Sequence, residues 1–151
     1  MSEQSHQETS GGFTVRRHLP ATAERVHAAF VEPSKLEQWF VVPGYETPAE
    51  RMRVDPRPGG RMEAVMISDA DGSEISFGFE YAELDPPHRV ALRFDEPREL
   101  VTVTMAETSD GSVDLTYVFL SWPAPADEEA PRRGVEGMLD LIDAAIRRGT
   151  I

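Results

Sequence analysis

The chain has 151 residues, a hydrophobic fraction of 40%, seven Phe, three Tyr and two Trp, which is enough for one folded domain with its own core. Its 15 basic and 27 acidic residues give a formal net charge of −12, and this charge excludes nucleic acid and anionic membrane surfaces as partners. The absence of cysteine excludes disulfides, thiolate catalysis and zinc ribbons, and it fits a cytoplasmic location. No apolar run approaches the roughly 20 residues of a membrane-spanning helix, so no membrane insertion is expected.

The first third of the chain predicts a leader, a strand and two short helices. Residues 1–12 are polar and end in two glycines, and we expect them to form a disordered leader. Residues 13–19 alternate loosely up to Pro20 and predict a strand. Thr22 precedes an acidic first turn and predicts the N-cap of a helix that ends near Pro33. Ser34 predicts the N-cap of a second short helix over residues 34–40.

The central part of the chain predicts an antiparallel sheet. Residues 50–55 are expected to form a strand, which a turn rich in Pro and Gly ends at residues 56–60. Beyond residue 61, apolar residues recur at every second position around 62–66, 75–81, 90–94, 101–105 and 113–119. Alternation of this kind is typical of a meander with one buried face. Charged residues of the opposite parity, such as Glu63, Glu80 and Arg93, are expected to face solvent.

The C-terminal part predicts a loop and one long helix. Residues 121–131 are rich in Pro and acidic residues and predict the loop. Over residues 132–148, apolar residues recur at helical spacing, and Gly149 follows two arginines that favour a helix end. One long helix lying across the concave face of a curved antiparallel sheet would bury both apolar surfaces.

Five short motifs occur in an order that is typical of a known family. The second helix brings an apolar residue, Trp-Phe and a Pro, and an Asp with Pro-Gly-Gly follows. A hairpin Asp-Gly, an acid-Pro-Pro turn with an Arg, and a last helix with Gly, Leu-Asp and two apolar residues complete the series. The motif residues are Leu36, Trp39, Phe40, Pro43, Asp55, Pro58, Gly59, Gly60, Asp71, Gly72, Asp85, Pro86, Pro87, Arg89, Gly134, Leu139, Asp140, Ile142 and Ile146. The chain thereby resembles the START-like SRPBCC superfamily, and most closely the branch named for the C-terminal domain of the activator of heat-shock protein 90 ATPase.

The resemblance implies a single α+β domain over residues 13–148 with the helix-grip fold. In that fold a curved antiparallel sheet of about six to seven strands wraps around a long C-terminal helix, and two short helices follow the first strand. The resemblance also implies a hydrophobic cavity between the sheet and the last helix. The family carries a Trp where this chain has Val135, and this departure predicts an enlarged or rearranged cavity.

The side chains expected at this cavity are the large residues of the inward strand faces and of the last helix. Met and aromatic side chains suit an adaptable apolar site, although they also fill ordinary cores. Trp39 and Phe40 are expected to anchor the pocket rim. The hydroxyls of Tyr81 and Tyr117 need a ligand, backbone or water partner if they are buried. The candidate pocket residues are Trp39, Met62, Met66, Phe77, Phe79, Tyr81, Val103, Met105, Tyr117, Phe119, Val135, Met138 and Ile142.

Motifs for catalysis or for a cofactor are missing from the sequence. It lacks the Gly-x-Ser-x-Gly nucleophile elbow, the P-loop and the Gly-x-Gly-x-x-Gly loop. The histidines form no metal-ligand pair at helical spacing and are expected at surface or turn positions. They are His6, His18, His27 and His88. We therefore expect no catalytic residue, no metal and no cofactor.

Three functions remain open at this level. The first is a non-catalytic binder of a small hydrophobic molecule (a lipid, a polyketide or an aromatic compound) that acts as a monomer or homodimer. The second is an enzyme similar to polyketide cyclases or aromatases, which requires polar groups in the cavity. The third is a stress-related or co-chaperone-like interaction module, for which twelve leader residues would not supply the separate N-terminal domain of such co-chaperones. The apolar inward stripes favour the first.

Overall fold

The computed structural model describes residues 10–95 and 97–151, and these residues form a mixed α+β domain. The elements follow in the order β1 (Gly11–Leu19), α2 (Ala23–Ala28), α3 (Pro33–Trp39), β2 (Tyr45–Glu46), the 3₁₀ helix η1 (Ala49–Arg51), β3 (Arg53–Val54), β4 (Arg61–Ser68), β5 (Glu74–Asp85), β6 (Arg89–Phe94), β7 (Arg98–Glu107), β8 (Val113–Trp122) and α4 (Glu129–Arg148). The predicted α+β class is confirmed.

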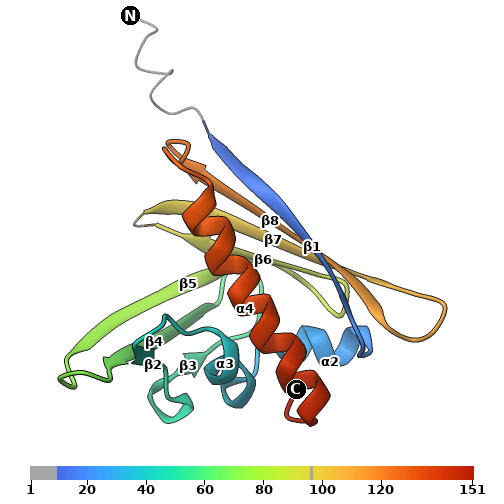
Figure 1. The fold of residues 1–151 in the computed structure, drawn as a ribbon, viewed down its shortest axis with the longest axis horizontal. Coiled ribbons are helices and arrows are strands. Elements are labelled where there is room, and N and C mark those ends of the chain that lie inside the picture. The colour runs from blue at the N-terminus through green and yellow to red at the C-terminus, as the bar shows by residue number, and fades with distance from the viewer. Residues whose placement is uncertain (1–9, 96) are drawn as a thin grey trace, which may run out of the picture.

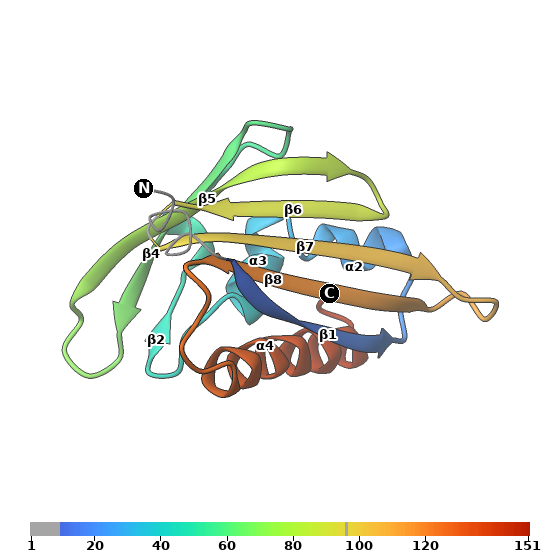
Figure 2. The same cartoon turned by 90° about the horizontal axis from the view of Figure 1, so that it is seen from above.

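All the strands join one antiparallel sheet. Its order is β1-β8-β7-β6-β5-β4-β2, and β3 pairs with β4. Strands β4 to β8 pair with their neighbours in chain order, as the alternation predicts, whereas β1 pairs with β8 over its full length. Helix α4 crosses one face of the strongly twisted sheet (Figures 1 and 2). The helix-grip fold is thus confirmed, and the sheet has eight strands because the two-residue strands β2 and β3 also pair with β4.

Strand β1 begins earlier than the alternation predicts. Gly11 and Gly12 pair with Ser121 and Leu120, so the predicted disordered leader is wrong for these two residues. A side chain at Gly12 would place its Cβ 1.7 Å from the carbonyl oxygen of Phe119, and glycine therefore permits the close approach of the two strands. Residues 1–9 of the predicted leader lie outside the described residues.

The two short helices begin and end at different residues from those predicted. Thr22 is the N-cap of α2, as expected, and its hydroxyl accepts a hydrogen bond from the first turn at 3.3 Å. The helix ends well before Pro33. Helix α3 begins at Pro33 with Glu32 as its N-cap, so the assignment of Ser34 as the cap is wrong. Proline is favoured at the first helical position because its missing N–H would have no partner there.

The segment predicted as a strand over residues 50–55 divides into two elements. Its first part is the 3₁₀ helix η1, which the Arg51 N–H closes by donating to the carbonyl of Pro48 at 3.1 Å. Only Arg53 and Val54 pair with β4. The prediction is therefore wrong for the first half of the segment, because a local turn after Pro48 competes with the sheet.

Helix α4 is longer than the sequence pattern predicts. It begins at Glu129 rather than at residue 132, and β8 extends to Trp122, so the predicted loop over residues 121–131 is shorter at both ends. The helix ends at Gly149, whose φ of +83° lies in the left-handed region that favours glycine. Its buried stripe consists of Val135, Leu139, Ile142, Ala145 and Ile146.

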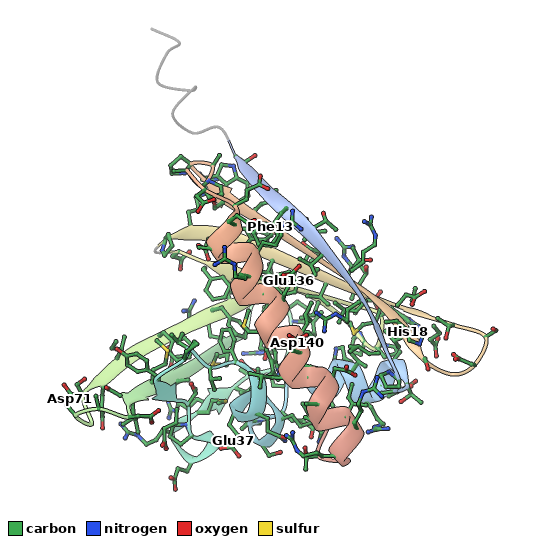
Figure 3. All side chains as sticks on the ribbon, viewed as in Figure 1. Phe13, His18, Glu37, Asp71, Glu136 and Asp140 are labelled. Atoms are coloured by element: carbon green, nitrogen blue, oxygen red, sulfur yellow. The ribbon has the colours of Figure 1, made fainter. Side chains whose placement is uncertain are left out.

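Arginine side chains join α4 to β1, the strand at one margin of the sheet. Arg132 donates to the backbone carbonyl of Thr14 at 3.1 Å. Arg17 forms an ion pair with Asp140 at 2.8 Å and donates to the carbonyl of Glu136 at 3.5 Å. Figure 3 shows Glu136 and Asp140 along the helix. These contacts fix the helix beside the first strand of the sheet.

Strand parity follows the predicted pattern on the solvent side. Glu63 and Arg93 are exposed, whereas Glu80 is half-buried and forms an ion pair with Arg93 at 3.1 Å. Ile75 departs from the pattern, because it was expected on the inward face and is 45% exposed near the tip of the β4–β5 hairpin. Within the described ranges, no helix has the length and apolar character to cross a membrane.

Candidate functional site

An apolar pocket opens between α4, the β4–β5 hairpin and the segment that follows α3. Its volume is about 160 Å³. The pocket is lined by Phe40, Val41, Val42, Met66, Phe77 and Met138. Val42 is 46% exposed, and the other five side chains are half-buried. The lining is almost wholly apolar, so it suits an apolar molecule better than water.

Three separate parts of the chain supply this lining. Helix α3 ends at Trp39, and Phe40 adopts a non-helical backbone with φ −87° and ψ 66°, so Val41 and Val42 leave the helix and run along the opening. Met66 and Phe77 come from β4 and β5, which pair in antiparallel register. The helix α4 contributes Met138 from the border of its buried stripe.

A sealed aromatic layer closes the rear of the apolar pocket. The ring of Phe40 lies 5.4 Å from that of Trp39 and 5.7 Å from that of Phe79, and the Phe79 ring lies 5.2 Å from that of Tyr81. Edge-to-face pairs at these distances are favourable. Trp39, Phe79 and Tyr81 are each at most 2% exposed, so water does not reach the rear of the pocket through this layer.

The polar ends of Trp39 and Tyr81 are bound by the backbone that follows α2. Trp39 Nε1 donates to the carbonyl of Ala29 and the Tyr81 hydroxyl donates to the carbonyl of Phe30, each at 2.7 Å. Burial raises the pKa of the Tyr81 hydroxyl well above its ordinary value. The position predicted for Trp39 at the pocket rim is wrong. Its ring is buried in the core, where its indole N–H donates to the carbonyl of Ala29.

The predicted pocket residues divide into two groups. Three of them, Met66, Phe77 and Met138, line the apolar pocket. The other ten are buried in the core, namely Trp39, Met62, Phe79, Tyr81, Val103, Met105, Tyr117, Phe119, Val135 and Ile142. Side-chain packing therefore fills much of the space that the resemblance assigns to a cavity.

The sequence placed Phe40 at the pocket, which it lines, but missed two further lining residues, Val41 and Val42, and one inward charge. Phe40, Val41 and Val42 form an apolar run between a helix end and Pro43, and such a run is a signal that could have indicated an exposed apolar edge. Glu99 has the inward parity of Val101 in β7, but the predicted strand began only at residue 101. The expectation that the inward positions are apolar except for the tyrosines is wrong at Glu99.

Glu99 and Tyr117 have the same parity on neighbouring strands, but Glu99 lies opposite Ser121, four residues along β8 from Tyr117. Burial raises the pKa of the half-buried Glu99 carboxyl. Burial also raises the pKa of the Tyr117 hydroxyl, and the nearby charge of Glu99 raises it further. Both shifts disfavour the ionised forms, since a charge is poorly solvated there and like charges repel.

Charged hollows lie elsewhere on the surface. Two of them, of about 480 and 390 Å³, share the side chains of Arg53, Arg61 and Glu63 in their walls. A third, of about 330 Å³, lies at the turn from β6 to β7 and includes Phe94 and Glu99. These hollows are larger than the apolar pocket, but their charged walls suit water better than an apolar molecule.

The histidines of the described residues do not line the apolar pocket, and His6 lies outside those residues. His18 pairs with Asp114 and His88 with Glu107, each at 2.9 Å and at exposed positions, as expected for surface residues. The prediction is wrong for His27, which is 8% exposed in α2. Across residues 10–95 and 97–151, no cluster of three or more His, Cys, Asp or Glu side chains is placed to hold a metal ion.

Comparison with known proteins places the fold among solved structures. The sequence profile of a family described as Activator of Hsp90 ATPase homolog 1-like protein matches residues 20–147. A protein from Chromobacterium violaceum is 29% identical over 90% of this chain and 96% of its own, with a TM-score of 0.73. An AHSA1-like protein from Aeromonas hydrophila is 20% identical over 92% and 94% of the two chains, with a TM-score of 0.78. A comparison with curated proteins finds no match.

Proposed function

The chain belongs to the family of Activator of Hsp90 ATPase homolog 1-like proteins, and on that premise we propose that it binds a small hydrophobic molecule in the apolar pocket. The SRPBCC fold of this family typically binds small hydrophobic ligands. The observation that carries the proposal is the lining of the pocket, in which six large apolar side chains from three parts of the chain surround one opening. A hydrophobic ligand would release water from this surface, which is the main favourable contribution to such binding.

The volume of the pocket limits the part of a ligand that it holds. A cavity of about 150 Å³ admits one benzene ring, so the 160 Å³ of the apolar pocket suits a single aromatic ring or a short aliphatic chain. Met66 from β4 and Met138 from α4 both line it. Unbranched Met side chains change rotamer readily, and we expect these two to move aside for a larger ligand.

Binding of an uncharged aromatic probe such as biphenyl tests this function. Met138→Glu places a carboxylate in the apolar lining, which an apolar ligand cannot solvate, so we expect the affinity to fall by about tenfold or more. Leu141→Glu is the matched control, because it adds the same charge to the same helix at a position that is 40% exposed and outside the pocket lining.

Calorimetric titration of the unmodified chain and the two variants gives the result directly. Equal loss of affinity in both variants would contradict binding at this pocket. Failure of the unmodified chain to show saturable binding with a Kd below about 1 mM would contradict the function itself. Thermal melting of each variant in the absence of probe shows whether it is folded.

A further inference from the structure

The most exposed large apolar side chains of the described residues gather around the apolar pocket. They are Val42, Ile75 and Leu141, which are 46%, 45% and 40% exposed. Val42 lines the pocket itself. Ile75 lies directly opposite the lining residue Met66 in the β4–β5 register, and Leu141 follows the lining residue Met138 by about one turn of α4. Single exposed hydrophobic side chains are ordinary, whereas a set that borders one opening points to an interaction surface. We call these three residues, together with the pocket lining, the extended apolar surface.

Helix α4 adds an uncharged stripe to the extended apolar surface. Gly134 and Met138 are four residues apart, as are Gly137 and Leu141, so the four lie along one side of the helix. A Cβ added at either glycine would meet no atom within 4 Å, so the space over this stripe is open. Glycine inside a helix is destabilising relative to alanine, but it permits another backbone to approach closely. The other exposed side of α4 is charged, with Glu129, Arg133, Glu136, Asp140 and Arg147.

Acidic side chains border the extended apolar surface on two sides. Glu37 lies on α3, one turn before the lining residue Phe40, and Asp69 and Asp71 lie in the turn of the β4–β5 hairpin. The N–H of Asp69 donates to the carbonyl of Gly44 at 2.9 Å, which places this turn beside the segment that follows α3. Figure 3 shows Asp71 at the end of the hairpin and Glu37 at α3. The three carboxylates form an acidic rim.

The charge of the acidic rim is not balanced by the neighbouring cations. Lys35 is paired with Glu32, and Arg51 with Glu74. Across residues 10–95 and 97–151, no Arg, Lys or His side chain forms an ion pair with a carboxylate of the acidic rim. A second copy of the chain, also of charge −12, would bring like charges together there, whereas a basic partner would be attracted. Charge complementarity therefore selects a partner with both an apolar face and basic side chains.

We propose that the extended apolar surface docks a basic amphipathic helix of another protein. The apolar face of that helix lies on the surface, and its Lys and Arg side chains face the acidic rim. The 160 Å³ of the apolar pocket receives one large apolar side chain of the helix, since a cavity of about 150 Å³ holds a benzene ring. Met66 and Met138 adapt to its shape, as in other helix-in-groove interfaces. The occupant is a protein segment, so the inference goes beyond the proposed function.

A synthetic amphipathic peptide tests this inference on the full chain. The probe has about five helical turns and consists of Leu and Lys, with leucines at i, i+3, i+4 and i+7 and with blocked ends. The control peptide has the same composition in an order that forms no apolar face. In calorimetric titration we expect the probe to bind with a Kd below about 0.1 mM and the control peptide to bind at least about tenfold more weakly.

Variants of the chain separate apolar contact from general attraction between charges. Ile75→Glu and Leu141→Glu each add a negative charge, which would strengthen a purely electrostatic association with the basic probe. We expect each to weaken binding by about tenfold instead, because the docked helix would desolvate the new carboxylate. Ala106→Glu adds the same charge at an exposed position near the β7–β8 turn, away from the β4–β5 hairpin (Figure 1), and should not weaken binding. Glu37→Gln combined with Asp69→Asn should weaken binding by about threefold and reduce its dependence on salt.

Three results would overturn the inference. The first is equal binding of the probe and the control peptide, or unchanged binding of the probe in both Ile75→Glu and Leu141→Glu. The second is a dimer of the chain alone in analytical ultracentrifugation that Leu141→Glu dissociates, which would make the surface a contact between two copies. The third is flotation of the chain with phosphatidylcholine vesicles that the same substitution abolishes, which would make it a membrane contact. Thermal melting of each variant shows that it is folded.

Titration with biphenyl keeps the two proposals distinguishable. Leu141→Glu should weaken the peptide probe and leave the affinity for biphenyl unchanged, because Leu141 lies outside the pocket lining. If biphenyl binds in the pocket but the peptide does not bind, the inference alone fails. If the peptide binds as expected and biphenyl does not, the proposed function alone fails.

Discussion

The two halves of α4 lie in different surroundings. The C-terminal half buries Leu139, Ile142, Ala145 and Ile146 against the core, and the residues after it bond to α3, where Thr150 Oγ1 donates to Gln38 at 2.7 Å. The N-terminal half buries only Val135, and its N-cap residue Glu128 makes no side-chain capping hydrogen bond. One helix therefore anchors the fold at one end and borders the apolar pocket at the other, so stability and ligand binding should be separable by mutation.

Deleting a side chain in each half of α4 should give the largest difference between them. Ile142 is fully buried, and Ile142→Ala should lower the free energy of unfolding by about 2–5 kcal/mol through lost burial and an unfilled cavity. Met138→Ala at the pocket should lower it by about 1 kcal/mol or less. Urea unfolding of both variants measures the difference, with the exposed Leu141→Ala as the control. Equal destabilisation by the first two variants would abolish the distinction between the halves.

The same contrast between a bonded and an unbonded group can be tested on the sheet by removing the hydroxyl of Tyr81 or that of Tyr117. Tyr81→Phe leaves the buried carbonyl of Phe30 without its donor and should cost about 1–3 kcal/mol of unfolding free energy. Tyr117→Phe removes a hydroxyl that has no partner among the described residues and should change stability by about 0.5 kcal/mol or less. Denaturant midpoints of the two variants check the order, and a larger loss for Tyr117→Phe would reverse it.

The pH dependence of stability should show a smaller effect, which comes from the buried His27 of α2. Burial lowers the pKa of His27 below its ordinary value of 6.5, so the unfolded chain binds the proton more readily than the folded chain. Stability contributed by the neutral imidazole is therefore complete above pH 6.5 and is lost as the pH falls from there toward the lower pKa of the folded state. Melting temperatures between pH 7.5 and 5 should fall less in His27→Gln than in the unmodified chain. The exposed His88→Gln is the control and should not reduce the fall.

Much of the fold could be predicted because long elements repeat their signal many times. Strands β4 to β8 alternate over six to twelve residues each, and the stripe of α4 recurs from Val135 to Ile146. Short elements carry too little signal. Pro48 decides that residues 49–51 form a 3₁₀ helix rather than a strand. Pro33 at the first position of α3 makes Glu32 the N-cap instead of Ser34.

The candidate site was less predictable because exposure depends on where elements end. Parity places Met62, Met66 and Phe77 on one face, but only tertiary packing decides that Met62 is sealed while Met66 and Phe77 border an opening. Glu99 was missed for a related reason. Strand β7 begins at Arg98, before its first inward apolar residue, Val101, and the pattern of hydrophobicity cannot show a half-buried charge as part of a strand.

The arginine contacts between α4 and β1 also govern how the protein can assemble. A strand at the margin of a sheet offers unpaired backbone groups to which another chain can add. On one margin, Arg132 binds the carbonyl of Thr14 and α4 lies alongside the strand; on the other, β2 offers only two paired residues. The Thr14 carbonyl is thereby already bonded within the chain, so a strand added to β1 from a second copy could not pair with it.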